Sequence, residues 1–193
     1  MTAADDDGRV RCDWAVGRTG PDFLLNRDYH DQEWGQPLHG QVPLFERMSL
    51  EAFQSGLSWL IILRKRENFR KAFDGFDIEK VARYTDADVD RLLADQGIVR
   101  NRAKIEATIA NARAVADVGD LSELLWSFAP APRPRPATLV DVPATTPEST
   151  AMARELKRRG FRFVGPTTAY ALMQATGMVD DHVQACWVLP TDS

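Results

Sequence analysis

Two cysteines and two histidines of this chain carry the kinds of side chain that bind zinc in proteins. His182 and Cys186 are four residues apart, so a helix would place both on one face. Cys12 and His30 lie near the opposite end of the chain. Four such ligands leave no open position on a tetrahedral zinc ion, which would therefore be structural rather than catalytic. Two buried thiols beside ordinary surface histidines explain the same spacing. His39 lies in a loop rich in glycine and proline and is expected to be solvated.

A carboxylate and four aromatic side chains could form a pocket for a planar base. Trp14, Tyr29, Trp34 and Trp59 offer faces on which such a base can stack. Glu51 lies among apolar neighbours in an expected helix, where a carboxylate needs a hydrogen-bonding partner. That partner could be another part of the protein or the exocyclic amine of a base. Aromatic residues more often belong to the core, so core packing is the alternative for each of the four.

A glycine-containing turn at residues 164–168 lies between two helix-like segments and could hold an anion. It resembles the hairpin of a helix-hairpin-helix DNA-binding unit, in which backbone amides and the start of the next helix face a phosphate. The segment around it is basic and contains Arg154, Lys157, Arg158, Arg159 and Arg162. The alternative is an ordinary turn between two helices with a solvated basic face.

The composition is that of one compact domain. The chain has 193 residues, of which 44% are hydrophobic, and a formal net charge of -4. Enough apolar residues are present for a sizeable core. The acidic balance argues against a protein that coats nucleic acid through its bulk charge, but it leaves a local basic patch open. No run of about 18 apolar residues occurs, so no membrane span is expected.

The chain ends indicate an intracellular protein. Residues 1–8 are acidic and lack the apolar core of a secretory signal, so we expect a short disordered tail. The two cysteines lie at opposite ends of the chain and do not form a disulfide framework. A reducing compartment is therefore the expected location.

Hydrophobic periodicity predicts a chain built of helices. Residues 9–40 contain too many glycines and prolines for a long helix and are expected to be irregular. Apolar residues then recur at steps of three and four, which predicts helices at about 41–55, 58–73, 85–94, 98–115 and 121–128. Thr85 and Asp88 form a capping box at the start of the third of these helices.

The C-terminal third begins with a proline-rich connection. Six prolines within residues 130–147 predict an extended segment. Pro147 suits the first position of a helix that we expect to end near Arg159. A helix to about Thr176 and a final helix from about Asp180 follow the turn. No convincing strand is found, so the predicted class is all-α, with about nine helices and an irregular N-terminal segment.

Taken together, these residues resemble the 3-methyladenine DNA glycosylase I family. The resemblance extends from about Arg11 to Pro190 and rests on an ordered set of motifs rather than on any one of them. The motifs are Arg11–Trp14, Tyr29–Gly35, Leu50–Trp59, Leu63–Phe69, Gly97–Ile105, Trp126–Phe128, Leu156–Gly165 and Asp181–His182.

The resemblance implies a helix-hairpin-helix glycosylase fold over residues 9–190, with two helical lobes and the base pocket between them. A structural zinc would join the two ends of the chain through Cys12, His30, His182 and Cys186. Glu51 would contact the edge of the base, and the four aromatic residues would form its pocket. The DNA backbone would be bound by Val164, Gly165, Thr167, Arg159 and Arg162.

The implied reaction is hydrolysis of the N-glycosidic bond of N3-methyladenine in alkylated duplex DNA, within base excision repair. The lesion would be flipped out of the stack and released as free 3-methyladenine. The superfamily's nucleophilic lysine has no counterpart in residues 166–171, which implies a monofunctional enzyme without an organic cofactor. A monomer acting on nucleoid DNA in a bacterial cytoplasm is expected. The alternatives are a zinc-stabilised DNA-binding module and a zinc hydrolase, which would need a vacant ligand position.

Three positions leave questions within the resemblance. Asn26 stands where family members often carry a second tyrosine, so one pocket wall could differ. Asp180 occupies the position of the superfamily's catalytic aspartate, but an aspartate there could equally be a helix cap. Leu57, beside Gly56, is a candidate for filling the gap that the flipped base leaves.

Overall fold

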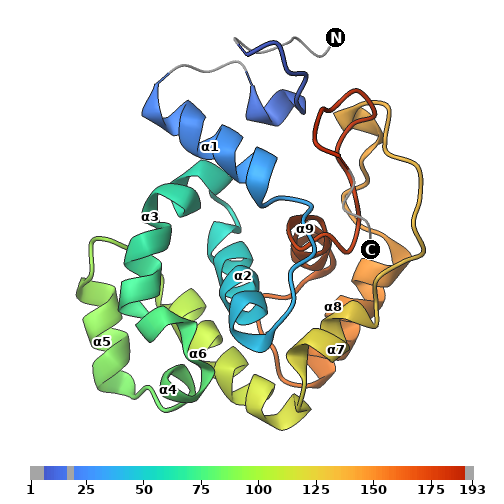
Figure 1. Cartoon of the computed structure of the whole chain (residues 1–193). Coiled ribbons are helices and arrows are strands. Elements are labelled where there is room, and N and C mark those ends of the chain that lie inside the picture. The colour runs from blue at the N-terminus through green and yellow to red at the C-terminus, as the bar shows by residue number, and fades with distance from the viewer. Residues whose placement is uncertain (1–6, 17–19, 190–193) are drawn as a thin grey trace.

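The computed structural model describes residues 7–16 and 20–189, and all the regular elements within these ranges are helices (Figure 1). Apart from Asp7 and Gly8, the expected tail 1–8 lies outside the described residues. The elements in chain order are η1 (Asp13–Ala15), α1 (Pro21–Gln32), α2 (Gln41–Gln54), α3 (Trp59–Ala72), η2 (Asp74–Phe76), α4 (Ile78–Ala82), α5 (Asp86–Ala94), α6 (Arg102–Val118), α7 (Leu121–Trp126), η3 (Leu139–Asp141), α8 (Pro147–Arg158) and α9 (Pro166–Ala175). The predicted all-α class is confirmed.

Helix α1 lies in the segment that was expected to be irregular, so that prediction was wrong. The helix begins at Pro21, directly after Gly20, and ends shortly before Gly35, so the same residues that suggested loops mark its ends. It has no apolar stripe along its length, since only Tyr29 and His30 are buried. Periodicity therefore could not reveal it.

Helix α2 passes through the middle of the molecule (Figure 1). Its buried residues lie on nearly every side of the helix, and Leu44, Phe45 and Phe53 are fully inaccessible to solvent. Helices α3 and α9 both pack against it. Because α2 carries Glu51, this central position takes the carboxylate into the interior.

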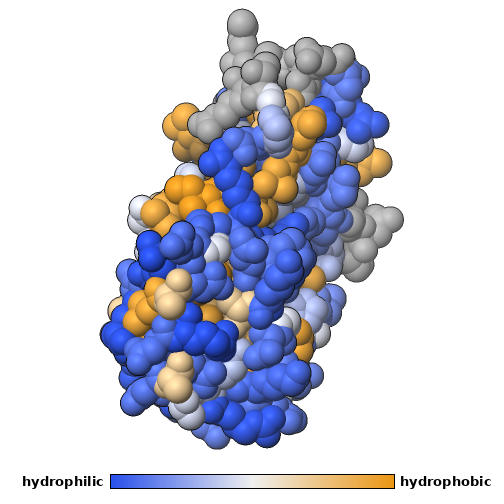
Figure 2. All heavy atoms as spheres, turned by 90° about the vertical axis from the view of Figure 1, so that its left-hand side faces the viewer, coloured by the Kyte–Doolittle hydropathy of each residue, from blue (hydrophilic) through white to orange (hydrophobic). Residues whose placement is uncertain are grey.

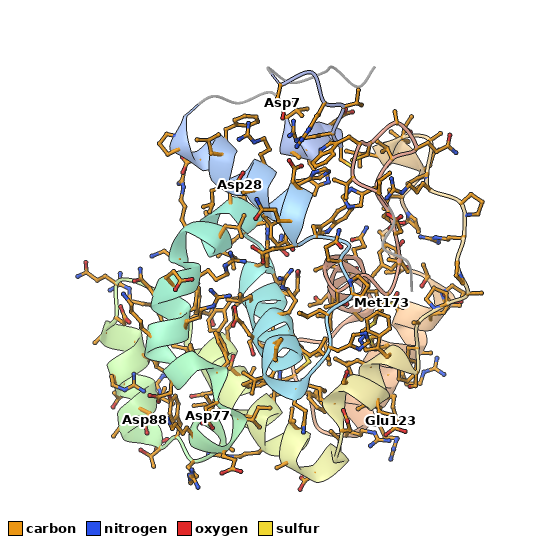
Figure 3. All side chains as sticks on the ribbon, in the orientation of Figure 1. Asp7, Asp28, Asp77, Asp88, Glu123 and Met173 are labelled. Atoms are coloured by element: carbon orange, nitrogen blue, oxygen red, sulfur yellow. The ribbon has the colours of Figure 1, made fainter. Side chains whose placement is uncertain are left out.

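Polar caps set the starts of several helices. Asp77 accepts a hydrogen bond from the amide of Lys80 at 3.0 Å, and Asp88 accepts one from the amide of Thr85 at 2.9 Å. Both caps lie at the outer edge of the molecule, where α4 and α5 begin (Figure 3). The capping box predicted at Thr85 is therefore confirmed.

No helix follows α9 in the described residues, so the predicted final helix from Asp180 was wrong. Backbone groups of this segment bond to distant parts of the chain instead of to the next helical turn. The amide of Gln184 donates to the carbonyl of Pro136 at 2.9 Å, and that of Trp187 donates to the carbonyl of Val10 at 2.8 Å. The C-terminal segment is thus held against the N-terminal one, as Figure 1 shows at the top of the molecule.

Buried apolar residues form one large cluster and one small cluster. The large cluster runs from Leu44 to Val179 and fills the space among the helices. The small cluster contains Cys12, Val183 and Cys186, so it joins the two ends of the described chain. The division into two lobes stays a prediction.

The two kinds of surface, hydrophilic and apolar, are separated on one face of the molecule (Figure 2). The face that carries α3 and α5 is largely hydrophilic, and apolar side chains gather toward α1 (Figure 2). None of the described helices is long and apolar enough to cross a membrane.

Gly177 lies at the closest approach between the end of α9 and the segment that follows α1. Its φ angle is 72°, and a Cβ atom there would lie 2.6 Å from the backbone of Gln36 and Pro37. The amide of Leu38 donates to the carbonyl of Thr176 at 3.1 Å in the same region. Only glycine fits both the backbone conformation and the space.

We expect Gly177→Ala to lower the free energy of unfolding by roughly 3 kcal/mol, because it combines a left-handed backbone penalty with a backbone clash. Gly75→Ala is the matched control, since its φ of 67° and ψ of 20° are left-handed but no atom lies within 4 Å of the added Cβ. This control should lose only about 1 kcal/mol. Urea unfolding measures both values, and equal losses would show that the close approach is unimportant.

Candidate functional site

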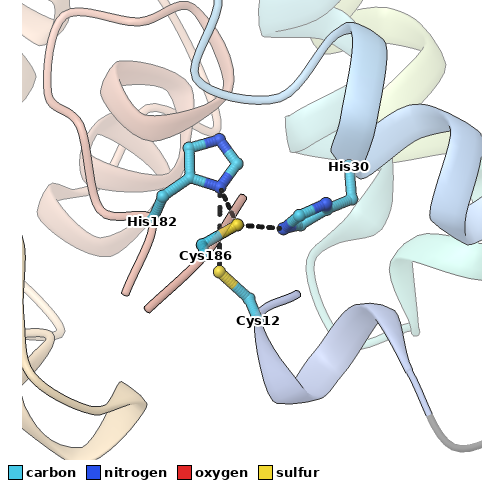
Figure 4. A group of neighbouring side chains, drawn as sticks. All are labelled: Cys12, His30, His182 and Cys186. Atoms are coloured by element: carbon cyan, nitrogen blue, oxygen red, sulfur yellow. Dashed lines mark hydrogen bonds between the residues drawn. The ribbon is translucent and has the colours of Figure 1, made fainter. Parts of the chain in front are cut away.

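The two cysteines and two of the three histidines converge from both ends of the chain (Figure 4). Their ligand atoms all lie within 4.8 Å of one another, and all four residues are buried. The Sγ of Cys186 lies 3.6 Å from Nε2 of His30 and 3.5 Å from Nδ1 of His182. The Sγ of Cys12 lies 3.7 Å from the same Nδ1.

The three sulfur–nitrogen separations match the edges of a tetrahedral zinc site. Zinc bonds of about 2.3 Å to sulfur and 2.0–2.1 Å to nitrogen give a tetrahedron with edges of about 3.3–3.8 Å. The three sulfur–nitrogen distances, from 3.5 to 3.7 Å, fall within that range. The donor set also suits zinc, because thiolate and imidazole are its preferred ligands. The residues present therefore suit this ion, and the widest separations among the four ligand atoms, which reach 4.8 Å, would shorten by about 1 Å when all four bind it.

The remaining ring nitrogens of the two histidines are fixed by hydrogen bonds. Nδ1 of His30 donates to Asp31 at 2.8 Å, and Nε2 of His182 donates to the carbonyl of Trp34 at 3.1 Å. These contacts leave Nε2 of His30 and Nδ1 of His182 free of protons and pointing toward the thiols. Asp31 is held in turn by two bonds from Nε of Arg11, at 2.9 and 3.0 Å.

His182 and Cys186 meet without the helix that their four-residue spacing predicted. A turn replaces it, in which the amide of Cys186 donates to the carbonyl of Val183 at 2.8 Å. The hydrogen bond between the thiols lowers the pKa of Cys186, and the two imidazoles lower it further. The same bond, together with burial, raises the pKa of Cys12. A divalent cation among these groups would bind both sulfurs as thiolates.

A cavity of about 340 Å³ lies beside the cluster and contains the predicted aromatic residues and Glu51. The rings of Trp14 and Trp34 meet edge to face, with centroids 5.1 Å apart. Those of Tyr29 and Trp59 lie 5.2 Å apart. The full lining consists of Trp14, Tyr29, Trp34, Glu51, Gln54, Trp59, Leu139, Val142, Ala171, Gln174 and Asp181.

The cavity and the cysteine–histidine cluster share a wall. The ring of Trp34 lies 4.7 Å from that of His182, and the ring of Trp14 lies 5.1 Å from that of His30. Each of these two tryptophans therefore lines the cavity and also packs against an imidazole of the cluster. The cluster sets the position of half of the aromatic lining.

Glu51 is one of two buried acids that line the cavity, with 5% of its surface exposed. Burial raises its pKa to about 7, against the opposing effect of Arg47. Arg47 is engaged elsewhere, because it donates to the hydroxyl of Tyr29 at 2.8 Å and to Glu33 at 3.2 Å. No hydrogen bond to the Glu51 carboxylate is found among the described residues, so it is available to a ligand.

The sequence did not single out the acid and amide that complete the cavity. Asp181 is 1% exposed and accepts hydrogen bonds from Tyr170 at 2.5 Å, Gln174 at 2.8 Å and Arg133 at 2.8 Å. The proline-rich connection also reaches the cavity through Leu139. Arg133 and Arg135 of that connection could have indicated buried acids nearby, since arginines in an extended proline-rich segment can hold it to the protein through ion pairs.

Asp180 lies outside the cavity lining, although the superfamily position drew attention to it. Its carboxylate pairs with Arg135 at 2.7 Å and accepts a bond from the amide of His182 at 3.2 Å. Asn26 also lies outside the lining and donates to the carbonyl of Trp14 at 2.9 Å. Both residues contact neighbours of the cavity rather than the cavity itself.

The basic segment and the glycine turn form a second cavity of about 560 Å³ between α8 and α9. Arg154, Lys157 and Arg162 line it, together with Gly165, while Arg159 is bound to Glu155 at 2.6 Å.

The exposure of the predicted turn residues differs. The side chain of Val164 is buried, whereas Gly165 and Thr167 are exposed. The buried Asn111 holds the turn in place, because its amide oxygen accepts a bond from the amide of Arg162 at 2.7 Å and its Nδ2 donates to the carbonyl of Arg162 at 3.1 Å.

Comparison with known proteins identifies the family. The model of the methyladenine glycosylase family matches residues 22–189. This chain belongs to the methyladenine glycosylase family. It is 44% identical over 186 residues to DNA-3-methyladenine glycosylase 1 of Escherichia coli, covering 93% of this chain and 97% of that protein. It is 43% identical over 184 residues to DNA-3-methyladenine glycosylase of Haemophilus influenzae, covering 92% and 96%.

Solved structures of methyladenine glycosylases share the fold. A crystal structure of 3-methyladenine DNA glycosylase I superposes with a TM-score of 0.87 at 44% identity, over 93% of this chain and all of that one. A tyrosine-to-phenylalanine variant of such an enzyme, in complex with 3-methyladenine, gives a TM-score of 0.84 at 35% identity, over 93% and 98%. The resemblance inferred from the motifs is thereby confirmed.

We expect Glu51→Gln to stabilise this methyladenine glycosylase at high pH. Because folding raises the pKa of Glu51 from 4.5 to about 7, ionising it destabilises the native state as the pH rises through that window. Above pH 7 the penalty is about 3 kcal/mol, which the amide removes.

Chemical denaturation between pH 5 and 8 measures this effect. The gain of Glu51→Gln over the wild type should shrink to about 1 kcal/mol at pH 5. Glu123→Gln, at an exposed position on α7 (Figure 3), is the control and should follow the wild type at every pH. A pH-independent difference for Glu51→Gln would contradict the raised pKa.

Proposed function

We propose that this protein is a DNA-3-methyladenine glycosylase, which hydrolyses the N-glycosidic bond of N3-methyladenine in alkylated duplex DNA and releases the free base. This step begins base excision repair. The observation that carries the proposal is the aromatic cavity around an unpaired buried carboxylate, Glu51. It occurs in a chain 43% and 44% identical to proteins named for this activity.

The chemistry of the lesion suits this cavity. Methylation at N3 makes the base cationic while it is joined to the sugar, so it is already a good leaving group and needs no strong general acid. The electron-rich faces of Trp14, Trp34 and Trp59 attract such a cation. The Glu51 carboxylate complements its charge and can accept a hydrogen bond from the exocyclic amine. Because the site is buried, these interactions are stronger than in water.

DNA is proposed to bind across α8, the glycine turn and the start of α9. Exposed amides at Gly165 and Thr167 can meet a phosphate at a helix N-terminus. The supporting cations are Arg154, Lys157 and Arg162, which line the adjacent cavity. Arg159 is a weaker candidate than the sequence suggested, because Glu155 neutralises it.

The lesion must leave the stack before it can enter the cavity, and the gap left behind must be filled. Leu57 is the proposed filler, because it is 36% exposed on the turn between α2 and α3. Gln54 and Trp59, on either side of that turn, line the cavity. A flipped base would thus lie beside an apolar side chain able to replace it.

We propose hydrolysis without a covalent protein intermediate. None of the described residues that line the cavity is a lysine, which fits the monofunctional reaction. Asp180 is proposed to orient the C-terminal segment rather than to act on the sugar, since Arg135 and the amide of His182 occupy its carboxylate. A DNA-binding module without catalysis would not require a buried unpaired acid in an aromatic cavity.

We propose that zinc, bound by Cys12, His30, His182 and Cys186, is a structural ion. Four protein ligands would leave no position for a metal-bound water, which argues against a zinc hydrolase. The ion would join residues far apart in the chain and thereby restrict the unfolded ensemble. The chain's own ligands are already aligned by Asp31 and the carbonyl of Trp34.

The protein is proposed to act as a monomer in the bacterial cytoplasm, on nucleoid DNA. The relatives from Escherichia coli and Haemophilus influenzae support a bacterial setting. The described surface beside the cavity provides both the turn and the cations needed to bind one DNA duplex. Cell fractionation and light scattering of the purified protein test these two statements.

The proposed activity predicts release of 3-methyladenine from methylated duplex DNA, identified by chromatography. With wild type, kcat/KM should fall as the pH decreases through about 7, because protonated Glu51 cannot complement the cation. Glu51→Gln should reduce kcat/KM at least tenfold and flatten this pH dependence. Absence of free 3-methyladenine with the wild-type protein would refute the activity, and an unchanged Glu51→Gln profile would refute the role of Glu51.

The metal proposal predicts one zinc per chain in the purified protein, measured by elemental analysis. Cys186→Ser should lose the zinc and lower the melting temperature by roughly 10 °C, because the bridge between the termini is lost. His39→Ala is the control, since His39 stacks on Trp126 and lies outside the cluster. A Cys186→Ser protein that keeps a full equivalent of zinc would contradict this ligand set.

A further inference from the structure

A short turn connects the helix of Glu51 to the helix of Trp59. It consists of residues 55–58, which follow α2 and precede α3. Gly56 has a φ of 81°, and Leu57 projects toward solvent. Within the turn, the amide of Leu57 donates to the carbonyl of Gln54 at 2.7 Å, and Nε2 of Gln54 donates to the carbonyl of Leu57 at 3.1 Å. These local bonds shape the turn but do not anchor it to the rest of the protein.

Lys104 provides that anchor from α6. Its Nζ donates to the carbonyl of Phe53 at 2.9 Å and to the carbonyl of Ser55 at 2.6 Å. Both oxygens lie at the C-terminal end of α2, where carbonyls lack partners within the helix and the helix dipole is negative. The lysine thus satisfies two carbonyls at the last turn of α2.

The environment of Lys104 is unusual for a lysine. It is 7% exposed, and no carboxylate pairs with it among the described residues. Burial lowers its pKa. A buried ammonium without a counter-ion costs free energy, and an apolar residue of similar length would fill the same space. Its two contacts therefore serve the geometry of the α2 end rather than the general stability of the core.

We propose that Lys104 is a positioning residue for base excision, which holds the turn at residues 55–58 beside the cavity while DNA is distorted. This inference rests on the proposed glycosylase function. When the duplex opens, the DNA presses on the turn that carries Leu57. A turn held only by its own hydrogen bonds would be displaced. Lys104 resists this displacement, because its bonds to the carbonyls of Phe53 and Ser55 connect the turn to α6.

The test compares Lys104→Met with two variants on the same helix. Lys104→Met keeps the length of the side chain and removes its donors. Arg113→Met removes a similar contact, from Arg113 to the carbonyls of Ala82 and Tyr84 at 2.8 and 2.9 Å, far along α6 from the turn. Ile105→Val truncates a fully buried neighbour and controls for loss of stability.

Three quantities are measured for each variant, well below its melting temperature. They are the single-turnover rate of 3-methyladenine release from duplex DNA, the affinity for free 3-methyladenine, and amide hydrogen exchange in a peptide covering residues 54–59. Lys104→Met should lose at least tenfold in rate and exchange faster in this peptide, with its affinity for the free base changed less than threefold. Arg113→Met and Ile105→Val should stay within twofold of wild type in rate.

A rate for Lys104→Met within twofold of the controls would overturn the proposal. So would a parallel loss of free-base affinity, because it would show that the cavity itself had collapsed. If Lys104→Met does not fold, Lys104→Gln carries the test: its amide nitrogen ends about one bond short of the lysine Nζ and cannot reach both carbonyls, so the rate should fall at least threefold, and an unchanged rate would overturn the proposal. Failure of wild type to release the base would refute the glycosylase function instead.

Discussion

The meeting of Cys12, His30, His182 and Cys186 is the constraint on which the site depends. Cys12 and His182 are 170 residues apart, yet their ligand atoms lie 3.7 Å from each other. Closing so long a loop costs conformational entropy, and the small apolar cluster around the thiols contributes to offsetting it. Two of the three tryptophans of the cavity, Trp14 and Trp34, pack against the two imidazoles of this group. The geometry of the cavity is therefore set by contacts between the chain ends.

Glu51 is a buried carboxylate without a partner among the described residues, which destabilises the fold but leaves a charge for a ligand in the cavity. Arg47 lies one helical turn away but is directed to Tyr29 and Glu33, so the carboxylate has no partner and its pKa rises to about 7. Partial retention of negative charge near neutral pH matches the needs of a cationic ligand. A salt bridge from Arg47 to Glu51 would stabilise the fold, but it would cancel that charge.

Sequence reasoning succeeded where local physics decides and failed where distant contacts decide. The caps at Thr85 and Pro147 and the apolar periodicity of α2 and α3 gave the helices within a residue or two. Helix α1 was missed because it has no apolar stripe. The helix predicted after Asp180 does not form, because backbone amides of this segment bond to Pro136 and Val10 instead. Those partners are unrelated in sequence and appear only in the fold.

The same distinction explains which site residues the sequence could identify. Glu51 and the aromatic residues stand out by type, because a buried acid and clustered tryptophans are chemically conspicuous. Adjacent acids such as Asp180 and Asp181 are not distinguishable by type. Their roles differ because Arg135 binds Asp180 behind the cavity, whereas Arg133 binds Asp181 in its lining.

The two arginines come from the proline-rich connection, an extended segment without helical hydrogen bonds of its own around them. Residues two apart in an extended segment point to the same side, so Arg133 and Arg135 can both reach the neighbouring acids Asp181 and Asp180. The ion pairs fix the register of the connection on the C-terminal segment. That register brings Leu139 and Val142 to the cavity. Ion pairs with Asp180 and Asp181, which lie in a turn and not in a helix, thus position one wall of the cavity.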